Sequence, residues 1–107
     1  MKHTVTVLPR AKRQLLEAAR WWSENRSQAE AARWFDGFEV ALASLATNPE
    51  RCGLAPENDA FPFTVRQLLY GLGRRVTHRA VFEVRGNEVI VHAIRHLAQQ
   101  DLAAGDI

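Results

Sequence analysis

The stretch that decides the fold is residues 76–96, VTHRAVFEVRGNEVIVHAIRH. Two runs rich in β-branched and aromatic residues flank the dipeptide Gly86-Asn87, which can adopt the positive φ angles of a two-residue hairpin turn. The stretch is therefore predicted to form a β-hairpin.

If Gly86 and Asn87 form the turn, the register of the hairpin follows: Arg85 faces Glu88, and Ala80 faces Ala93. Because side chains alternate across a sheet, one face is then almost wholly apolar and the other is mixed. The apolar face carries Ala80, Phe82, Val84, Val89, Val91 and Ala93, and the mixed face carries Thr77, Arg79, Val81, Glu83, Ile90, His92, Ile94 and His96. We expect the first face to pack on helices and the second to stay free for a ligand, although a slip of one residue would exchange the two faces.

The rest of the chain supplies helices before this hairpin. Residues 2–8 alternate like a short strand, Pro9 suits the first position of a helix over residues 10–24, and Ser27 with Glu30 forms a capping box for a second helix that ends near Ala46. Residues 50–62 have no periodicity and are predicted to be a loop that covers the core or contacts a partner, and residues 63–70 a strand. The order β-α-α-β-β-β predicts an α+β fold, with an antiparallel helical hairpin on one face of a small, mainly antiparallel sheet and the first strand at its edge.

The composition is typical of one globular domain. The chain has 107 residues, of which 47% are hydrophobic and 24% are charged, so we expect a single domain over residues 1–107. No apolar run approaches the roughly 20 residues that a membrane span needs, and the first residues lack the pattern of a signal peptide. The lone Cys52 excludes an internal disulfide and fits a reducing cytoplasm, where we expect the protein to act. We expect no cofactor, and no metal either, because no carboxylate cluster accompanies His78, His92 and His96 at ligand spacing.

Arginine is concentrated in the strand region. The net charge of the whole chain is only +2, but residues 63–96 carry six arginines against Glu83 and Glu88. These are Arg66, Arg74, Arg75, Arg79, Arg85 and Arg95. Arginine presents a planar fork that binds phosphate or carboxylate, so the cluster favours an anionic partner. The plainer interpretation is that scattered arginines solvate a surface.

The three tryptophans divide into two groups. Trp22 and Trp34 lie on the apolar stripes of the two predicted helices, which indicates core positions. Trp21 falls off its stripe, so a role as a stacking platform for a nucleic-acid base stays open for this residue.

The order of elements and three local segments resemble the RelE/ParE superfamily of toxins from bacterial type II toxin–antitoxin modules, the plasmid stabilisation type. Residues 65–68 (VRQL) resemble the family's Val-Arg-Glu-Leu segment. Residues 78–84 (HRAVFEV) and 89–96 (VIVHAIRH) resemble its last two strands. The resemblance implies a toxin that inhibits growth and is neutralised by an antitoxin, in a hetero-oligomer, without a membrane.

The family resemblance also implies two modes of action. Some members cut mRNA on the ribosome, and others poison DNA gyrase without evident catalytic chemistry. By its position, Arg79 matches the strand arginine that cleaving members place on the scissile phosphate, and Arg95 and His96 match the pair that ends the last strand. The predicted catalytic set is therefore Arg79, Arg95 and His96, with Arg66, Arg74 and Arg75 as residues that bind the nucleic acid or target.

The sequence departs from the cleaving members at one place. Many of them carry a tyrosine about five residues after the last strand, where this chain has Asp101, and its only tyrosine is Tyr70. The predicted register puts Arg79 and His96 on one face and Arg95 on the other, so a second titratable group would have to come from Glu83 or His92. Alternatively, Arg79 and Glu83 form only a surface salt bridge, worth about 0.5 kcal/mol, in a protein-binding module without catalysis.

Overall fold

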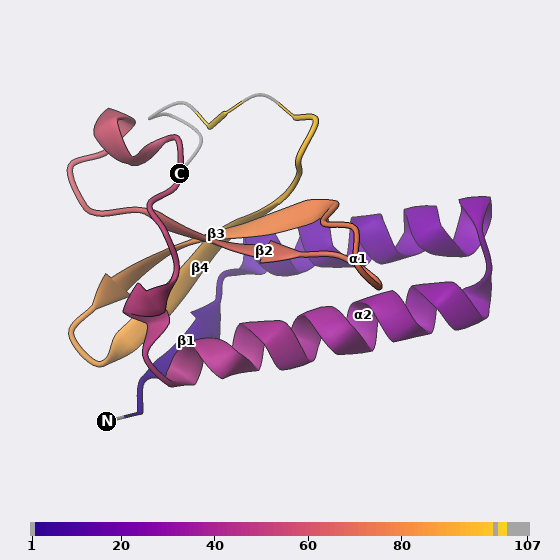
Figure 1. Ribbon diagram of the computed structural model, residues 1–107, viewed down its shortest axis with the longest axis horizontal. Helices are drawn as coiled ribbons and strands as arrows, with labels where there is room; N and C mark the ends of the chain where they lie inside the picture. The colour runs from indigo at the N-terminus through magenta and orange to yellow at the C-terminus, as the bar shows by residue number, and fades with distance from the viewer. Residues whose placement is uncertain (1, 100, 103–107) are drawn as a thin grey trace.

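The computed structural model describes residues 2–99 and 101–102 (Figure 1). The helices and strands are β1 (Thr4–Val7), α1 (Pro9–Asn25), α2 (Gln28–Ala43), β2 (Arg66–Tyr70), β3 (His78–Arg85) and β4 (Glu88–His96). Three short 3-10 turns, Ser44–Ala46, Pro49–Arg51 and Asn58–Ala60, lie between α2 and β2. The predicted β-α-α-β-β-β order and the α+β class are confirmed.

The two helices form an antiparallel hairpin that lies against the sheet. Helix α1 begins at Pro9, as predicted, and α2 is capped by Ser27, whose hydroxyl accepts a hydrogen bond from the Glu30 N–H at 3.0 Å. The buried side chains of α2 face the strands, and the largest of them are Trp34 and Phe38. At the end where α1 is connected to α2, both helices extend beyond the strands of the sheet (Figure 1).

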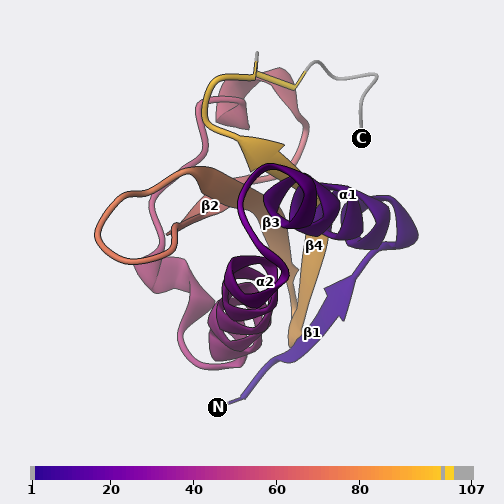
Figure 2. The same ribbon diagram turned by 90° about the vertical axis from the view of Figure 1, so that its right-hand side faces the viewer.

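The sheet has four strands in the order β1-β4-β3-β2. Strand β1 pairs in parallel with β4, and the other two pairings are antiparallel. The first strand therefore lies at the edge, as predicted, and the last strand lies next to it in the interior of the sheet. Helices α1 and α2 cover one face (Figure 2).

A β-bulge in β4 corrects the predicted register. From the turn, where Gly86 has φ 60°, the strands pair as predicted as far as Phe82 with Val91. The register then shifts between Val81 and Phe82, so that Val81 pairs with Ala93 and His92 is the extra residue. Ala80 consequently faces Ile94 and not Ala93, and Ile94 joins the core under the helices.

The second face of the sheet is also covered, contrary to the prediction that it stays free. Ala55 and Val65 from the segment before β2, together with Leu102, form a second buried cluster with Val81 and Ala93. The Ala55 N–H donates to the Val65 carbonyl at 2.8 Å, which closes this segment into a compact loop. Of the two roles predicted for residues 50–62, the structure shows the covering of the core.

Candidate functional site

A groove of about 1050 Å³ lies on the helix side of the sheet. One wall is the second half of α1, which contributes Glu17, Trp21 and Trp22. The other walls are the β2–β3 loop, with Arg75 and Val76, and the segment that follows β4. Trp21 is 53% exposed here, so the tryptophan that left the apolar stripe lines the groove.

The bulge brings His96 beside His78 in this groove. The shifted register pairs His78 with His96, on the face that α1 and α2 cover, and their ring centroids are 5.0 Å apart. His78 is buried against Trp34, and burial together with the neighbouring His96 lowers the pKa of His78 to about 4. His78 is therefore neutral at pH 7. His96 is exposed, and its Nδ1 accepts a hydrogen bond from the Ala98 N–H at 3.0 Å.

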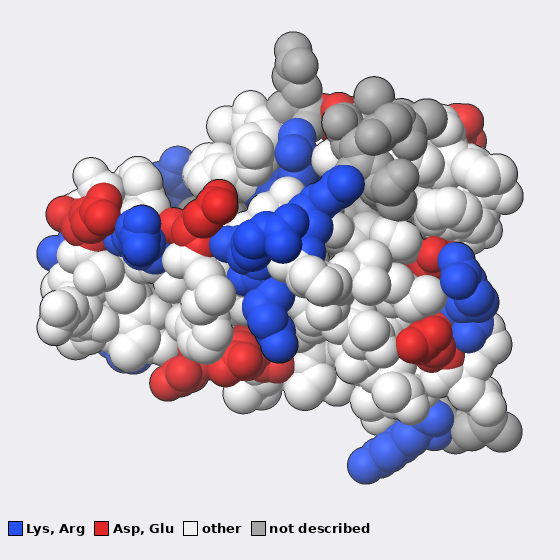
Figure 3. Space-filling view, turned by 180° about the vertical axis from the view of Figure 1, so that it is seen from behind, with Lys and Arg blue, Asp and Glu red and all other residues white. Residues whose placement is uncertain are grey.

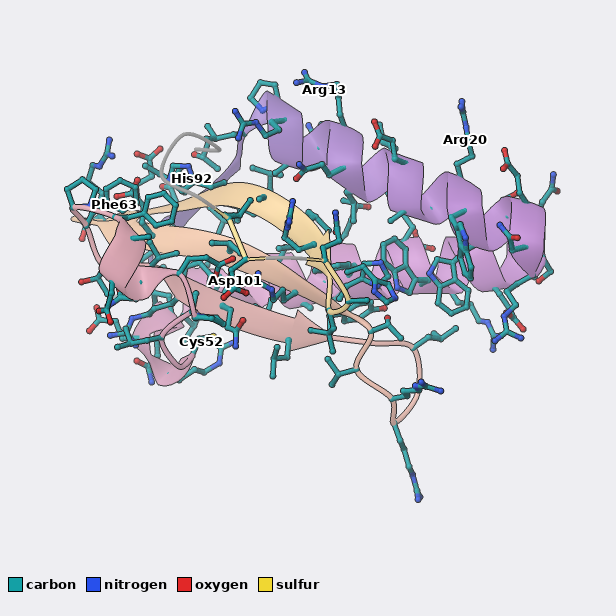
Figure 4. All side chains as sticks on the ribbon, turned by 90° about the horizontal axis from the view of Figure 1, so that it is seen from above. Arg13, Arg20, Cys52, Phe63, His92 and Asp101 are labelled. Carbon is teal, nitrogen blue, oxygen red and sulfur yellow. The ribbon has the colours of Figure 1, made fainter. Side chains whose placement is uncertain are left out.

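Arg79 lies on the other face, away from the groove. Its guanidinium is 5% exposed and donates to both carboxylate oxygens of Glu57, with a 2.8 Å bond to Oε1. The Leu102 N–H donates to the same carboxylate at 3.0 Å. Asp101 approaches Arg79 to 3.8 Å and lies over the strands in Figure 4. Burial alone would raise the pKa of Glu57, but the hydrogen bonds from Arg79 and Leu102 outweigh it and lower the pKa.

The predicted catalytic residues are thus divided between two faces. Arg79 pairs in register with Arg95, so both lie on the face that Ala55, Val65 and Leu102 cover, and Arg95 is half-buried there. His96 lies on the opposite face and lines the groove. The sequence predicted the reverse arrangement, with Arg79 and His96 together, and that prediction is wrong because it did not include the extra residue His92. A strand with one inserted residue turns every later side chain to the opposite face.

The predicted target-binding arginines are also separated. Arg66 donates to the Cys52 carbonyl at 2.7 Å and to that of Glu50 at 3.4 Å, so it fastens the loop before β2. Arg74 and Arg75 are exposed in the β2–β3 loop, and Arg75 lines the groove.

Glu83 does not pair with Arg79, which corrects the alternative interpretation of these two residues. Its Oε1 accepts from Arg85 at 2.9 Å and lies 2.7 Å from His92 Nε2. The His92 ring stacks on Phe63, and the two lie together at one end of the sheet in Figure 4. Both residues proposed as the second titratable group, Glu83 and His92, therefore bind each other at a distance from the groove.

The only tyrosine of the chain has a structural role. The Tyr70 hydroxyl donates to the Trp34 carbonyl at 2.9 Å, and its ring stacks on Phe38. Burial raises the pKa of Tyr70. The close approach of Gly37 to this hydroxyl leaves no room for a side chain at position 37.

Sequence reasoning missed Glu57 altogether. Glu57 lies in a segment without periodicity, and its partner Arg79 is 22 positions away, so no local pattern links them. Within the described residues, no group of three or more His, Cys, Asp or Glu side chains is placed to hold a metal ion. None of the described helices has the length and apolar character that crossing a membrane requires.

Comparisons with known proteins give one consistent result. The family model described as "ParE toxin of type II toxin-antitoxin system, parDE" matches residues 5–101. A solved structure titled "Chromosomal ParDE TA system from P. aeruginosa" superposes with a TM-score of 0.71 at 18% identity, over 89% of this chain and 96% of that chain. No curated protein sequence matches. Because the family model covers nearly the whole sequence, the chain belongs to the ParE toxin family of type II toxin–antitoxin systems.

Proposed function

We propose that this toxin arrests growth by binding DNA gyrase, without cutting RNA, and that an antitoxin segment neutralises it by occupying the groove. The proposal that the toxin does not cut RNA rests on the burial of Arg79 and its ion pair with Glu57. Its charge is buried and balanced by the Glu57 carboxylate, so it is not available to hold a scissile phosphate.

The separation of the other groups supports the same conclusion. Cleavage of RNA through its 2′-hydroxyl requires a base, an acid and a cation around one phosphate. Here His96 lies in the groove and Arg79 and Arg95 lie on the opposite face of the sheet. Of the two modes that the family resemblance implies, inhibition of gyrase does not need such a set, and this favours gyrase as the target.

The groove has the chemistry that an antitoxin segment would recognise. Its rim exposes the apolar side chains of Trp21, Val76 and Leu97, and Arg26 and Arg75 are exposed beside them. An amphipathic helix that carries acidic residues beside its apolar face would match both features. Such a segment would be disordered alone and would fold on the toxin.

The target is tested by inducing the chain in bacteria that lack the antitoxin and following labelled methionine and labelled thymidine in parallel. We expect thymidine incorporation to stop first, with an SOS response, and the purified toxin to inhibit supercoiling by gyrase. Prompt loss of methionine incorporation with intact thymidine incorporation would show that translation is the target. The variant His96→Gln distinguishes gyrase inhibition from RNA cleavage further. An RNA-cutting enzyme that uses this imidazole would no longer produce cleaved RNA in the variant, whereas gyrase inhibition does not require it.

The antitoxin surface is tested by pull-down with the cognate antitoxin. Trp21→Ala and Arg75→Glu should weaken binding at least tenfold, because each removes one of the two features of the rim. Arg33→Glu is the matched control, since Arg33 is exposed on α2 and does not line the groove. Equal binding by all three variants would place the antitoxin elsewhere.

A further inference from the structure

We propose that the basic outer surface of α1, formed by Arg10, Lys12, Arg13 and Arg20, binds the phosphate backbone of duplex DNA. All four side chains are exposed. This would be a second binding surface, separate from the groove, and it does not depend on which target the toxin inhibits.

The charges of this surface are not used inside the protein. Other arginines have partners, such as Glu57 for Arg79, Glu83 for Arg85 and the Cys52 carbonyl for Arg66. By contrast, within residues 2–99 and 101–102 no carboxylate forms an ion pair with any of the four cations of the α1 surface.

The position of the cations along α1 makes their field stronger. Three of them fall within residues 10–13, and the first turn of α1 holds no acidic residue. Helices more often place acidic side chains in the first turn, where the positive end of the peptide dipoles favours them. Here like charges stand together at that end, and binding of an anion would relieve their repulsion. Glu17 lies between Arg13 and Arg20 on the same side of α1, and Glu24 follows Arg20 one turn later, so the unbalanced positive charge is concentrated in residues 10–13.

The surface faces outward. Arg13 and Arg20 are seven residues apart and therefore lie on one side of the helix, and Figure 4 shows both pointing away from the sheet. In the view from behind, where α1 lies in front, Lys and Arg side chains gather in the middle of the molecule (Figure 3). A segment bound in the groove would leave this side of α1 uncovered, since neither Arg13 nor Arg20 lines the groove.

Three features favour duplex DNA among polyanions. The surface is a convex helix, which the wide major groove of B-form DNA admits and the narrow major groove of A-form RNA does not. Single strands are held by exposed aromatic rings, but the exposed tryptophan of α1, Trp21, lies in the groove. An acidic peptide needs apolar anchors, and the cations are accompanied only by the single exposed Leu16.

The test is fluorescence anisotropy of a labelled 20-base-pair duplex titrated with the purified full-length chain. With about three phosphates neutralised, affinity should fall roughly twentyfold between 50 and 150 mM salt. The triple variant Arg10→Glu, Lys12→Glu, Arg13→Glu should bind at least tenfold more weakly, with an unchanged circular dichroism spectrum. The control triple Lys2→Glu, Arg33→Glu, Arg74→Glu makes the same change in net charge at exposed residues outside the groove and should keep most of the affinity.

Two outcomes would overturn the proposal. Equal losses in both triple variants would show that binding follows net charge and not the α1 surface. Binding of a polyglutamate peptide as tight as that of the duplex, lost in the first triple variant, would assign the surface to an acidic protein. Either result would leave the inhibition of gyrase untouched, because that activity is measured separately.

Discussion

At the scale of single residues, Glu57 and Arg79 form a buried ion pair on the face of the sheet that Ala55, Val65 and Leu102 cover. Both side chains are almost fully buried, so removal of one leaves an uncompensated charge. We therefore expect Glu57→Ala to lower the free energy of unfolding by about 3–5 kcal/mol in urea titrations. Arg85→Ala removes the exposed partner of Glu83 and should cost at most about 1 kcal/mol.

A double variant makes this prediction sharper. Glu57→Leu with Arg79→Met removes both charges together, and apolar replacement of a buried ion pair is often neutral. The double variant should therefore be more stable than Glu57→Ala alone. If Glu57→Ala were as stable as Arg85→Ala, the buried pair would contribute nothing beyond a surface contact.

His78 gives the protein a dependence on pH. Its pKa is about 4 in the folded chain and about 6.5 for an ordinary histidine, so between these values only the unfolded chain binds the proton. The free energy of unfolding should fall as the pH drops from about 6.5 to 4, by about 3 kcal/mol in total. His78→Phe keeps a ring against Trp34 and should show a smaller fall between pH 7 and 5 in the same urea titrations. An identical fall in both proteins would assign the effect to other groups.

At the scale of elements, α2 and β2 meet at a contact that only glycine permits. A Cβ at Gly37 would lie 2.2 Å from the Tyr70 hydroxyl oxygen, which donates to the Trp34 carbonyl. In an ordinary helix interior, replacing glycine by alanine stabilises by about 1 kcal/mol. Here we expect Gly37→Ala to destabilise by about 1–3 kcal/mol, seen as a lower Tm. Combining it with Tyr70→Phe should recover part of the loss, since the nearest atom is then absent.

The elements also show where reasoning from sequence reached its limit. The helices follow from Pro9 and the Ser27 cap, and the hairpin follows from Gly86-Asn87, because each signal is local. The bulge at His92 left no such signal. Ala93 and Ile94 are both apolar, so either register puts an apolar side chain under the helices, and the alternation of side chains does not distinguish them. That single residue decides which face His96 and Arg95 occupy, and so which of the predicted catalytic residues lie together.

At the scale of the whole molecule, apolar layers cover the sheet on both faces. The helices form one layer, and residues around Ala55 with Leu102 form the other. The sequence predicted a covering role as one of two alternatives for residues 50–62. It did not indicate which face they cover, because the loop has no periodicity and its contacts reach from Glu57 to Leu102, 45 positions apart.

This arrangement predicts that the covering loop unfolds with the sheet. The Ala55 amide, bonded to the Val65 carbonyl, should exchange with deuterium at a rate within about tenfold of the Phe82 amide in β3. Leu102→Ala, which opens the second cluster, should speed exchange at Ala55 more than at Phe82. Much faster exchange at Ala55 in the unaltered chain would mean that the loop opens independently.

The position of β4 has a consequence for synthesis on the ribosome. This strand binds β1 on one side and β3 on the other, yet it is the last strand to be translated. Until residue 96 has been added, β1 has no strand to pair with and the helical hairpin has no complete surface to pack on. The four-stranded sheet therefore cannot be completed until β4 has been translated. An antitoxin already present in the cell would meet each new molecule at the moment it folds.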